Sequence, residues 1–230
     1  MRTLKTAWLI AAKDLRLELR SWHSLAMMLA LALAVIFAFA FSLGTQTMAR
    51  VGAERLVPAV LWLTLVFAAL VGFRNSFLLE SERDAMSGLL MAPSDRSAIY
   101  LGKLAANLAA VLLLEAVIVP LAALFFGVDL PAVAMSLAAV LAVHTYGLCA
   151  IGTLLGGLVN RMRRGESLLA ILLLPLLVPL LISAGKSTSA VLAGRPLAEA
   201  EVRFWIVLAA AFGLILSSIA VLVFEFLLED

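Results

Sequence analysis

The sequence predicts an all-α, polytopic membrane protein with six transmembrane helices and an N-terminal interfacial amphipathic helix. Apolar residues make up 64% of the chain and charged residues 14%, whereas soluble domains have about 45–50% and about 25%. The apolar residues are gathered in blocks, and the first 24 residues instead alternate apolar and basic positions at helical spacing. Residues 1–230 therefore form one membrane domain, without room for a separate nucleotide-binding or catalytic domain.

Residues 1–24 predict a helix that lies in the plane of the membrane surface. Five apolar side chains fall on one stripe of this helix, and three basic side chains fall opposite them. Such a helix turns its apolar side toward the lipid and its basic side toward water and headgroups. The apolar stripe is Leu4, Trp8, Leu15, Leu19 and Trp22, and the basic face is Lys13, Arg16 and Arg20.

Six hydrophobic runs follow, and each is long enough to be read as one membrane span. A spanning helix needs about 20 apolar residues, with a range of about 17–25. The fifth run contains Pro175 and Pro179, each of which removes a helix hydrogen bond, so we expect this span to be kinked, broken or re-entrant. The runs are Leu25–Leu43, Leu56–Phe73, Leu104–Phe126, Pro131–Val159, Leu168–Ala184 and Phe204–Leu228.

The distribution of Lys and Arg predicts the orientation. With the N-terminus inside, twelve of the 17 basic residues fall on the cytoplasmic side and five on the other. This asymmetry places both termini in the cytoplasm under the positive-inside rule. The five residues on the outer side are Arg50, Arg55, Lys186, Arg195 and Arg203.

The cytoplasmic stretch 80–103 separates the second and third spans and is the longest polar interval between any two hydrophobic runs. Its apolar residues recur at spacings of three and four, which predicts a short amphipathic helix. We interpret it as a coupling region that a soluble ATPase grips by helix-in-groove contact; the alternative is a solvated loop. The candidate coupling residues are Glu80, Glu82, Arg83, Asp84, Met86, Gly88, Leu89, Leu90 and Pro93.

Two ionisable residues are expected at similar depth near the middle of the membrane: Glu115 in the third span and His144 in the fourth. Because a charge at that depth is costly, such residues face the bundle interior and find a partner. We expect the two to approach each other, directly or through water or a hydroxyl such as that of Thr145. The hypotheses are a structural clasp, a role in gating or substrate passage, or heme ligation by His144.

Three other features of the sequence are weaker indications of function. Gly185-Lys186-Ser187-Thr188 resembles the end of a P-loop, but Leu180 stands where the motif needs glycine, and the topology places the segment outside the cell. Gly152, Gly156 and Gly157 permit close helix contact, within the chain or in a dimer. The single cysteine, Cys149, excludes an intrachain disulfide, and a net charge of +2 gives no indication of nucleic-acid binding.

The chain resembles the CcmB family, the permease subunit of the ABC-type heme exporter in cytochrome c maturation. Three stretches carry the resemblance, in the same order and with the same six-span plan. They are Lys13–Arg20, Glu80–Lys103 with its Gly-Leu-Leu-Met-Ala-Pro and Tyr-Leu-Gly-Lys segments, and His144–Gly157 followed by Pro175–Pro179.

The resemblance implies an ABC-2-like permease in the bacterial inner membrane. A CcmA-type ATPase would hydrolyse ATP, so this chain would not itself be an enzyme. The permease would form a homodimer, work with CcmC- and CcmD-type subunits, and serve a CcmE-type chaperone indirectly. Heme is a possible substrate, and no firmly bound cofactor or metal is expected. The alternative functions are an ABC-2-type permease for a lipid, drug or polysaccharide, an intramembrane enzyme using Glu115 and His144, and a non-transporting assembly scaffold.

Overall fold

The computed structural model describes residues 2–43, 50–82, 97–160 and 166–227. Seven α-helices are assigned within these ranges, and six of them are long and apolar enough to cross a membrane. The prediction of an all-α protein with six spans is confirmed. The helices are α1 (Arg2–Ser21), α2 (His23–Ser42), α4 (Ala53–Glu82), α6 (Ser97–Phe126), α7 (Leu130–Asn160), α8 (Glu166–Leu192) and α9 (Ala200–Leu227).

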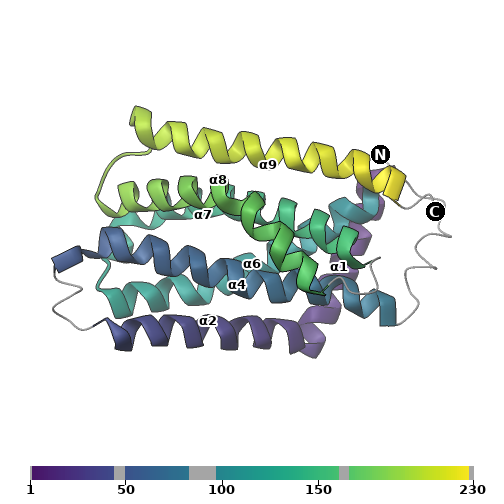
Figure 1. Ribbon diagram of the computed structural model, residues 1–230, viewed down its shortest axis with the longest axis horizontal. Helices are drawn as coiled ribbons and strands as arrows, with labels where there is room; N and C mark the ends of the chain where they lie inside the picture. The colour runs from purple at the N-terminus through teal and green to yellow at the C-terminus, as the bar shows by residue number, and fades with distance from the viewer. Residues whose placement is uncertain (1, 44–49, 83–96, 161–165, 228–230) are drawn as a thin grey trace.

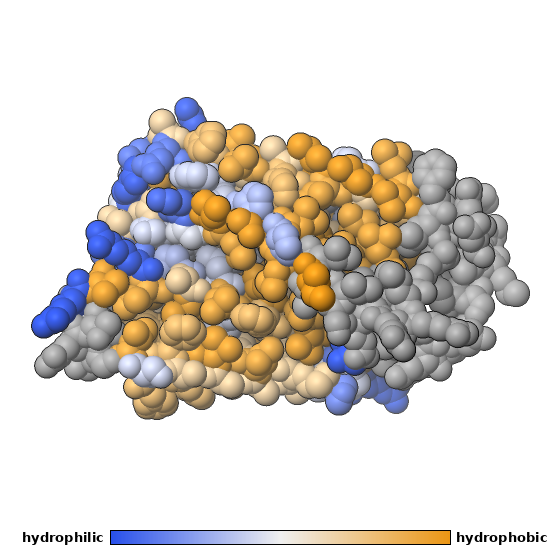
Figure 2. Space-filling model, viewed as in Figure 1, coloured by the Kyte–Doolittle hydropathy of each residue, from blue (hydrophilic) through white to orange (hydrophobic). Residues whose placement is uncertain are grey.

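The six long helices form a bundle, and α1 crosses one end of it (Figure 1). The C-terminal ends of α4, α7 and α9 lie at the same end as α1, whereas the α6–α7 and α8–α9 connections lie at the other. Hydrophobic side chains cover the middle of the face shown in Figure 2, and hydrophilic ones gather toward the ends. This is the surface expected of a bundle surrounded by lipid.

Helix α1 has one face packed against the bundle and another directed outward. Ala7 and Ile10 are buried, because this face of α1 lies against α6. Four residues of the apolar stripe identified in the sequence point outward, with Trp8 72% and Trp22 62% exposed; the fifth, Leu15, is half-buried and lines a cavity beneath the helix. An outward stripe that contains two tryptophans suits a helix at the boundary between lipid and water.

The centre of the bundle is α7, which contacts α4, α6, α8 and α9. Its small residues make this possible. A Cβ atom at Gly152 would collide with the ring of Phe73 on α4, and one at Gly157 with the ring of Phe224 on α9. Gly152 and Gly157 therefore serve contacts within the chain.

The fifth span is neither broken nor re-entrant. Helix α8 is continuous from Glu166 to Leu192 with Pro175 and Pro179 inside it, and Figure 1 shows it bent along its length. A membrane helix tolerates proline where neighbouring helices and local adjustments accommodate the freed carbonyls. The sequence correctly predicted distortion, and the suggestion of a break was wrong.

The C-terminal part of α8 also corrects the expected boundary of the fifth span. The sequence predicts that the fifth span ends at Ala184 and that Gly185-Lys186-Ser187-Thr188 lies outside the cell, but this segment continues α8, and Ser187 and Thr188 are fully buried. Thr188 accepts a hydrogen bond from the indole Nε1 of Trp62 on α4, at 2.9 Å. The helix extends here because its polar side chains have partners inside the bundle.

Candidate functional site

Lys103, in the second turn of α6, is a charged residue with almost no exposed surface. Its Nζ atom lies 2.9 Å from Asp14 Oδ2 on α1 and donates to the Ser76 carbonyl oxygen on α4 at 2.6 Å. The ammonium also sits 5.3 Å from the centroid of the Phe77 ring, within the range of a cation–π contact. One side chain therefore links α1, α4 and α6.

This arrangement gives the buried ammonium what a low-dielectric environment requires. Lys103 is 1% exposed, and a buried charge is tolerated when it is paired and hydrogen-bonded. Asp14 is also 3.1 Å from Lys13 Nζ at the outer edge of α1. The sequence placed Lys103 among the cytoplasmic loop charges; instead it lies inside the junction between α1, α4 and α6, which we call the Lys103 junction.

Close contact between α1 and α6 reinforces the junction. A Cβ atom at Gly102 would lie 2.7 Å from Ile10 Cβ and 2.8 Å from the Ala7 carbonyl oxygen. Only glycine lets the two backbones approach this closely. Helix α1 is therefore held to the first turns of α6 by both packing and charge.

The chain turns sharply from α1 into α2 beside this junction. Trp22 takes a left-handed conformation, with φ 54° and ψ 2°, which is uncommon for a residue other than glycine. Glu18 Oε1 accepts a hydrogen bond from the backbone N–H of Leu25 at 2.7 Å. This bond satisfies a donor in the first turn of α2, which has no partner within its own helix.

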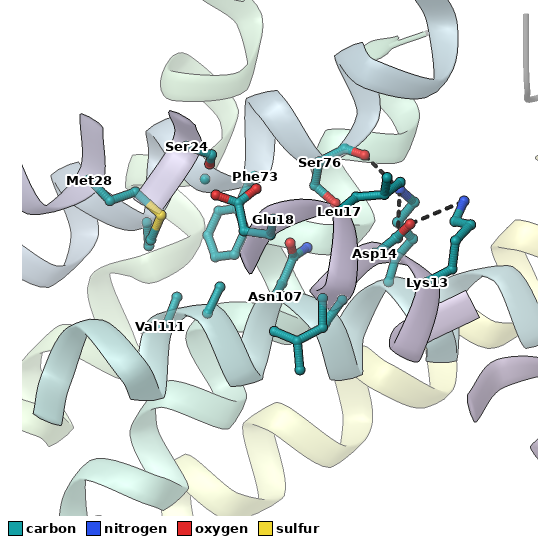
Figure 3. Close-up of a pocket in the computed structure, with 16 residues that line it drawn as sticks. Lys13, Asp14, Leu17, Glu18, Ser24, Met28, Phe73, Ser76, Asn107 and Val111 are labelled. Atoms are coloured by element: carbon teal, nitrogen blue, oxygen red, sulfur yellow. Dashed lines mark hydrogen bonds and ion pairs between the residues drawn. The ribbon is translucent and has the colours of Figure 1, made fainter. Parts of the chain in front are cut away.

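A cavity of about 160 Å³ lies beneath α1, between α2, α4 and α6. Figure 3 shows Glu18 of α1 and Asn107 of α6 pointing toward the same space, with Phe73 and Met28 beside it. Its walls are mainly apolar, and its charged lining residues are Lys13, Asp14, Glu18 and Lys103. The cavity thus adjoins the Lys103 junction.

The predicted intramembrane polar residues form two separate contacts. Thr145 Oγ1 donates to Glu115 Oε1, which joins α7 to α6. His144, the residue before Thr145, points toward α8: its Nε2 atom lies 2.9 Å from Ser183 Oγ. Glu115 therefore pairs with the expected hydroxyl, whereas His144 has a different partner.

Ser183 extends the contact of His144 to α9. Its hydroxyl donates to the Trp205 carbonyl oxygen at 2.6 Å, and His144 Nδ1 lies 2.7 Å from the Val140 carbonyl oxygen. Both ring nitrogens of His144 are thus engaged within the protein, an arrangement that favours a clasp between helices over an axial ligand. The residues described contain no group of three or more His, Cys, Asp or Glu side chains placed to hold a metal ion.

The candidate coupling residues fall at the border of what the structure describes. The backbones of Glu80 and Glu82 belong to the last turn of α4, and their side chains lie outside the described set. The other seven lie outside the described residues: Arg83, Asp84, Met86, Gly88, Leu89, Leu90 and Pro93. The Lys103 junction lies close in sequence to both ends of this segment, through Ser76 and Lys103.

Sequence reasoning missed the partners Asp14, Ser76, Ser183 and Thr188. Hydropathy treats a polar residue as a sign of a helix end, whereas Lys103, Ser183 and Thr188 are buried with partners on other helices. Ser76 contributes its backbone carbonyl oxygen, which a hydropathy value does not report. The sequence did offer a signal for an ion pair between Asp14 and Lys103, since one acid and one base border apolar runs on separate segments. Their pairing requires knowledge of how α1 crosses the bundle.

Comparison with known proteins extends over nearly the whole chain. The family model described as CcmB protein matches residues 5–226. Heme exporter protein B of Pseudomonas aeruginosa is 27% identical over 188 residues, which is 82% of this chain and 82% of that relative. The matched range contains the Lys103 junction, the cavity and the polar contacts of α7 and α8.

Proposed function

The chain belongs to the CcmB family, and on this premise we propose that it is the permease subunit of an ABC-type complex that exports or handles heme for cytochrome c maturation. One observation carries the proposal: the family match spans residues 5–226, which takes in nearly all of α1 and the six candidate spans. The name of the Pseudomonas relative, heme exporter protein B, indicates heme as the cargo.

The energy source in this proposal is a separate CcmA-type ATPase. The segment of this chain that resembles a P-loop is part of α8, where Ser187 and Thr188 are buried. A P-loop works by wrapping exposed backbone N–H groups around phosphates, and a continuous helix has none to offer there. ATP hydrolysis is therefore assigned to the partner and movement to this chain.

The proposed route for force begins at the segment 80–103 and passes through the Lys103 junction. A push on this segment acts on the end of α4 and the start of α6. Because Lys103 bonds to Asp14 and to the Ser76 carbonyl, α1 would move together with both helices. The spans then tilt as a group, and the permease needs no acid–base chemistry of its own.

In the proposed orientation, both termini and the segment 80–103 face the cytoplasm, in the bacterial inner membrane. The excess of basic residues on this side supports the orientation. So does the common position of α1 and the C-terminal ends of α4, α7 and α9 at one end of the bundle (Figure 1). The proposed complex contains a homodimer of this chain with CcmA-, CcmC- and CcmD-type subunits, and it acts on a CcmE-type chaperone indirectly.

Co-purification tests the assignment of the coupling region. Reversal of the charges of Glu80, Glu82, Arg83 and Asp84 should abolish recovery of an ATP-hydrolysing protein with this chain and leave membrane insertion intact. Reversal of Glu199 and Glu201 is the matched control and should retain the partner. Glu199 belongs to the α8–α9 connection and Glu201 to the first turn of α9, and this connection lies at the opposite end of the bundle (Figure 1). Full recovery of the ATPase with the first variant would remove the coupling assignment.

The nature of the cargo needs its own measurement. Cells that lack this chain should lose assembly of c-type cytochromes, and the wild-type chain should restore it. Normal cytochrome assembly in the deletion strain, together with an altered content of lipid or polysaccharide at the cell surface, would instead favour an ABC-2-type permease for another substrate.

A further inference from the structure

The cavity beneath α1 is large enough to hold part of a ligand. Its volume of about 160 Å³ exceeds by about tenfold the ~15 Å³ that one water molecule needs. The walls include Met28 and Phe73, each 1% exposed, and polar groups of Glu18, Ser24 and Asn107 line the same space (Figure 3). The site is therefore apolar with a small polar part, as is typical of binding pockets.

The mouth of the cavity lies along one edge of α1. Among its lining residues, the Lys13 side chain is 41% exposed and Leu17 is 38% exposed, and the two are one helical turn apart. The outward tryptophans of α1 place this edge at the level of lipid headgroups. The molecules present at that depth in a membrane are phospholipids.

The polar lining selects among headgroups. Lys13 and Lys103 balance Asp14 and Glu18, so the lining carries no net charge and fits a headgroup that is itself neutral overall.

The cavity also offers hydrogen-bond acceptors. Glu18 accepts one hydrogen bond from the N–H of Leu25, and a carboxylate can accept about four hydrogen bonds. The side-chain Nδ2–H of Asn107 donates a hydrogen bond to Thr153 Oγ1 at 2.9 Å, which leaves the side-chain carbonyl oxygen of Asn107 to face a ligand. These acceptors match a group with several N–H donors.

We infer that this cavity binds the headgroup of phosphatidylethanolamine, whose primary ammonium donates to Glu18 and Asn107. The phosphate lies at the mouth beside Lys13, and the glycerol and first acyl carbons contact Leu17 and Met28. Phosphatidylcholine has the same net charge but no N–H donor, and phosphatidylglycerol has no cation. The inference rests on the fold and the cavity and is independent of the cargo.

Native mass spectrometry of the full-length protein tests this site. The protein is taken from nanodiscs that contain equal parts of phosphatidylethanolamine, phosphatidylcholine and phosphatidylglycerol, and the lipids that remain bound are counted. One phosphatidylethanolamine per chain should be retained, in at least about tenfold excess over phosphatidylcholine, because the discrimination rests on charge-assisted hydrogen bonds. Equal retention of the two zwitterionic lipids would overturn the proposal, as would preferential retention of phosphatidylglycerol.

Glu18→Gln connects the selectivity to the cavity. Glutamine keeps an acceptor for the N–H of Leu25 but loses the negative charge, so the ratio of ethanolamine to choline lipid should fall about tenfold. Asp129→Asn, an exposed position between α6 and α7 at the other end of the bundle, removes the same charge and should leave the ratio unchanged. Because the readout is a ratio of bound lipids within each variant, a lower yield of folded protein does not mimic the effect. An unchanged ratio in Glu18→Gln would overturn the assignment to this cavity.

Discussion

Lys103 Nζ on α6 lies 2.9 Å from Asp14 Oδ2 on α1, with side chains that are 2% and 13% exposed. The pair fastens the helix that crosses the end of the bundle to a spanning helix, beside the segment proposed to receive force. Coulomb attraction offsets desolvation here because the ammonium also donates to the Ser76 carbonyl.

Replacement of Lys103 should therefore be much more damaging than replacement of its neighbour on α1. Lys103→Met leaves the Asp14 carboxylate without its buried partner and should lower the free energy of unfolding by about 3–5 kcal/mol. Lys13→Met removes an ammonium on a side chain that is 41% exposed and should cost at most about 1 kcal/mol. Thermal unfolding in detergent compares the stabilities of the two variants.

A double variant tests whether Lys103 and Asp14 pair directly. Asp14→Asn combined with Lys103→Met should recover part of the stability that Lys103→Met loses, and strictly additive changes in unfolding free energy would contradict a direct pair.

The contact between α1 and α6 gives a second prediction. Gly102→Ala places a methyl group within 2.8 Å of the Ala7 carbonyl oxygen, so α1 must move away and the unfolding temperature should fall by several degrees, the scale of a cost of about 1–3 kcal/mol. Gly185→Ala on α8 is the matched control, because nothing lies within 4 Å of that position and alanine is the better helix former. If both variants were equally stable, the close approach of α1 to α6 would be wrong.

The six spans could be predicted because blocks of apolar residues report directly on lipid, but the span boundaries could not. Lys103 and Thr188 look like loop residues in a hydropathy profile, yet both are buried because Asp14 and Trp62 supply partners from distant helices. The same limit applies to His144. Its depth followed from its position in the span, whereas its partner Ser183 depends on the rotation of α7 against α8.

Ser183 on α8 bonds to residues of α7 and α9, so loss of its hydroxyl should remove contacts among three helices. Ser183→Ala leaves both His144 Nε2 and the Trp205 carbonyl oxygen without the hydroxyl that they share, and should cost about 1–3 kcal/mol of unfolding free energy. Ser218→Ala on α9 removes an exposed hydroxyl that bonds only to the Leu214 carbonyl one turn earlier; its cost should be within about 0.5 kcal/mol. Comparable unfolding temperatures for the two variants would contradict a clasp at Ser183.

The α8–α9 connection carries a pH-dependent contact. The Arg195 guanidinium donates to the Glu199 carboxylate, and this hydrogen bond lowers the pKa of Glu199 below its usual value. A carboxylate with a lowered pKa stabilises the fold above its unfolded pKa and loses that effect as pH falls through the folded pKa. Wild type should therefore be slightly more stable than Glu199→Gln at neutral pH, with the difference vanishing in acid. The effect is small because the pair is exposed. A difference that persists in acid, or in an Arg195→Gln background, would rule out this pair as its source.

The role of Glu115 can be separated from its structural contact with Thr145. Glu115→Gln keeps an oxygen that accepts from Thr145 Oγ1, whereas Glu115→Leu leaves that hydroxyl unpaired inside the bundle at a cost of about 1–3 kcal/mol. If the contact is a clasp, the glutamine variant should show normal complex yield and normal assembly of c-type cytochromes, and the leucine variant should lose yield. Normal yield of the glutamine variant combined with lost cytochrome assembly would show that the carboxylate itself is needed, because the hydrogen bond would remain while the ionisable group would be gone. Such a result would move Glu115 from holding α6 against α7 to acting in gating or substrate passage.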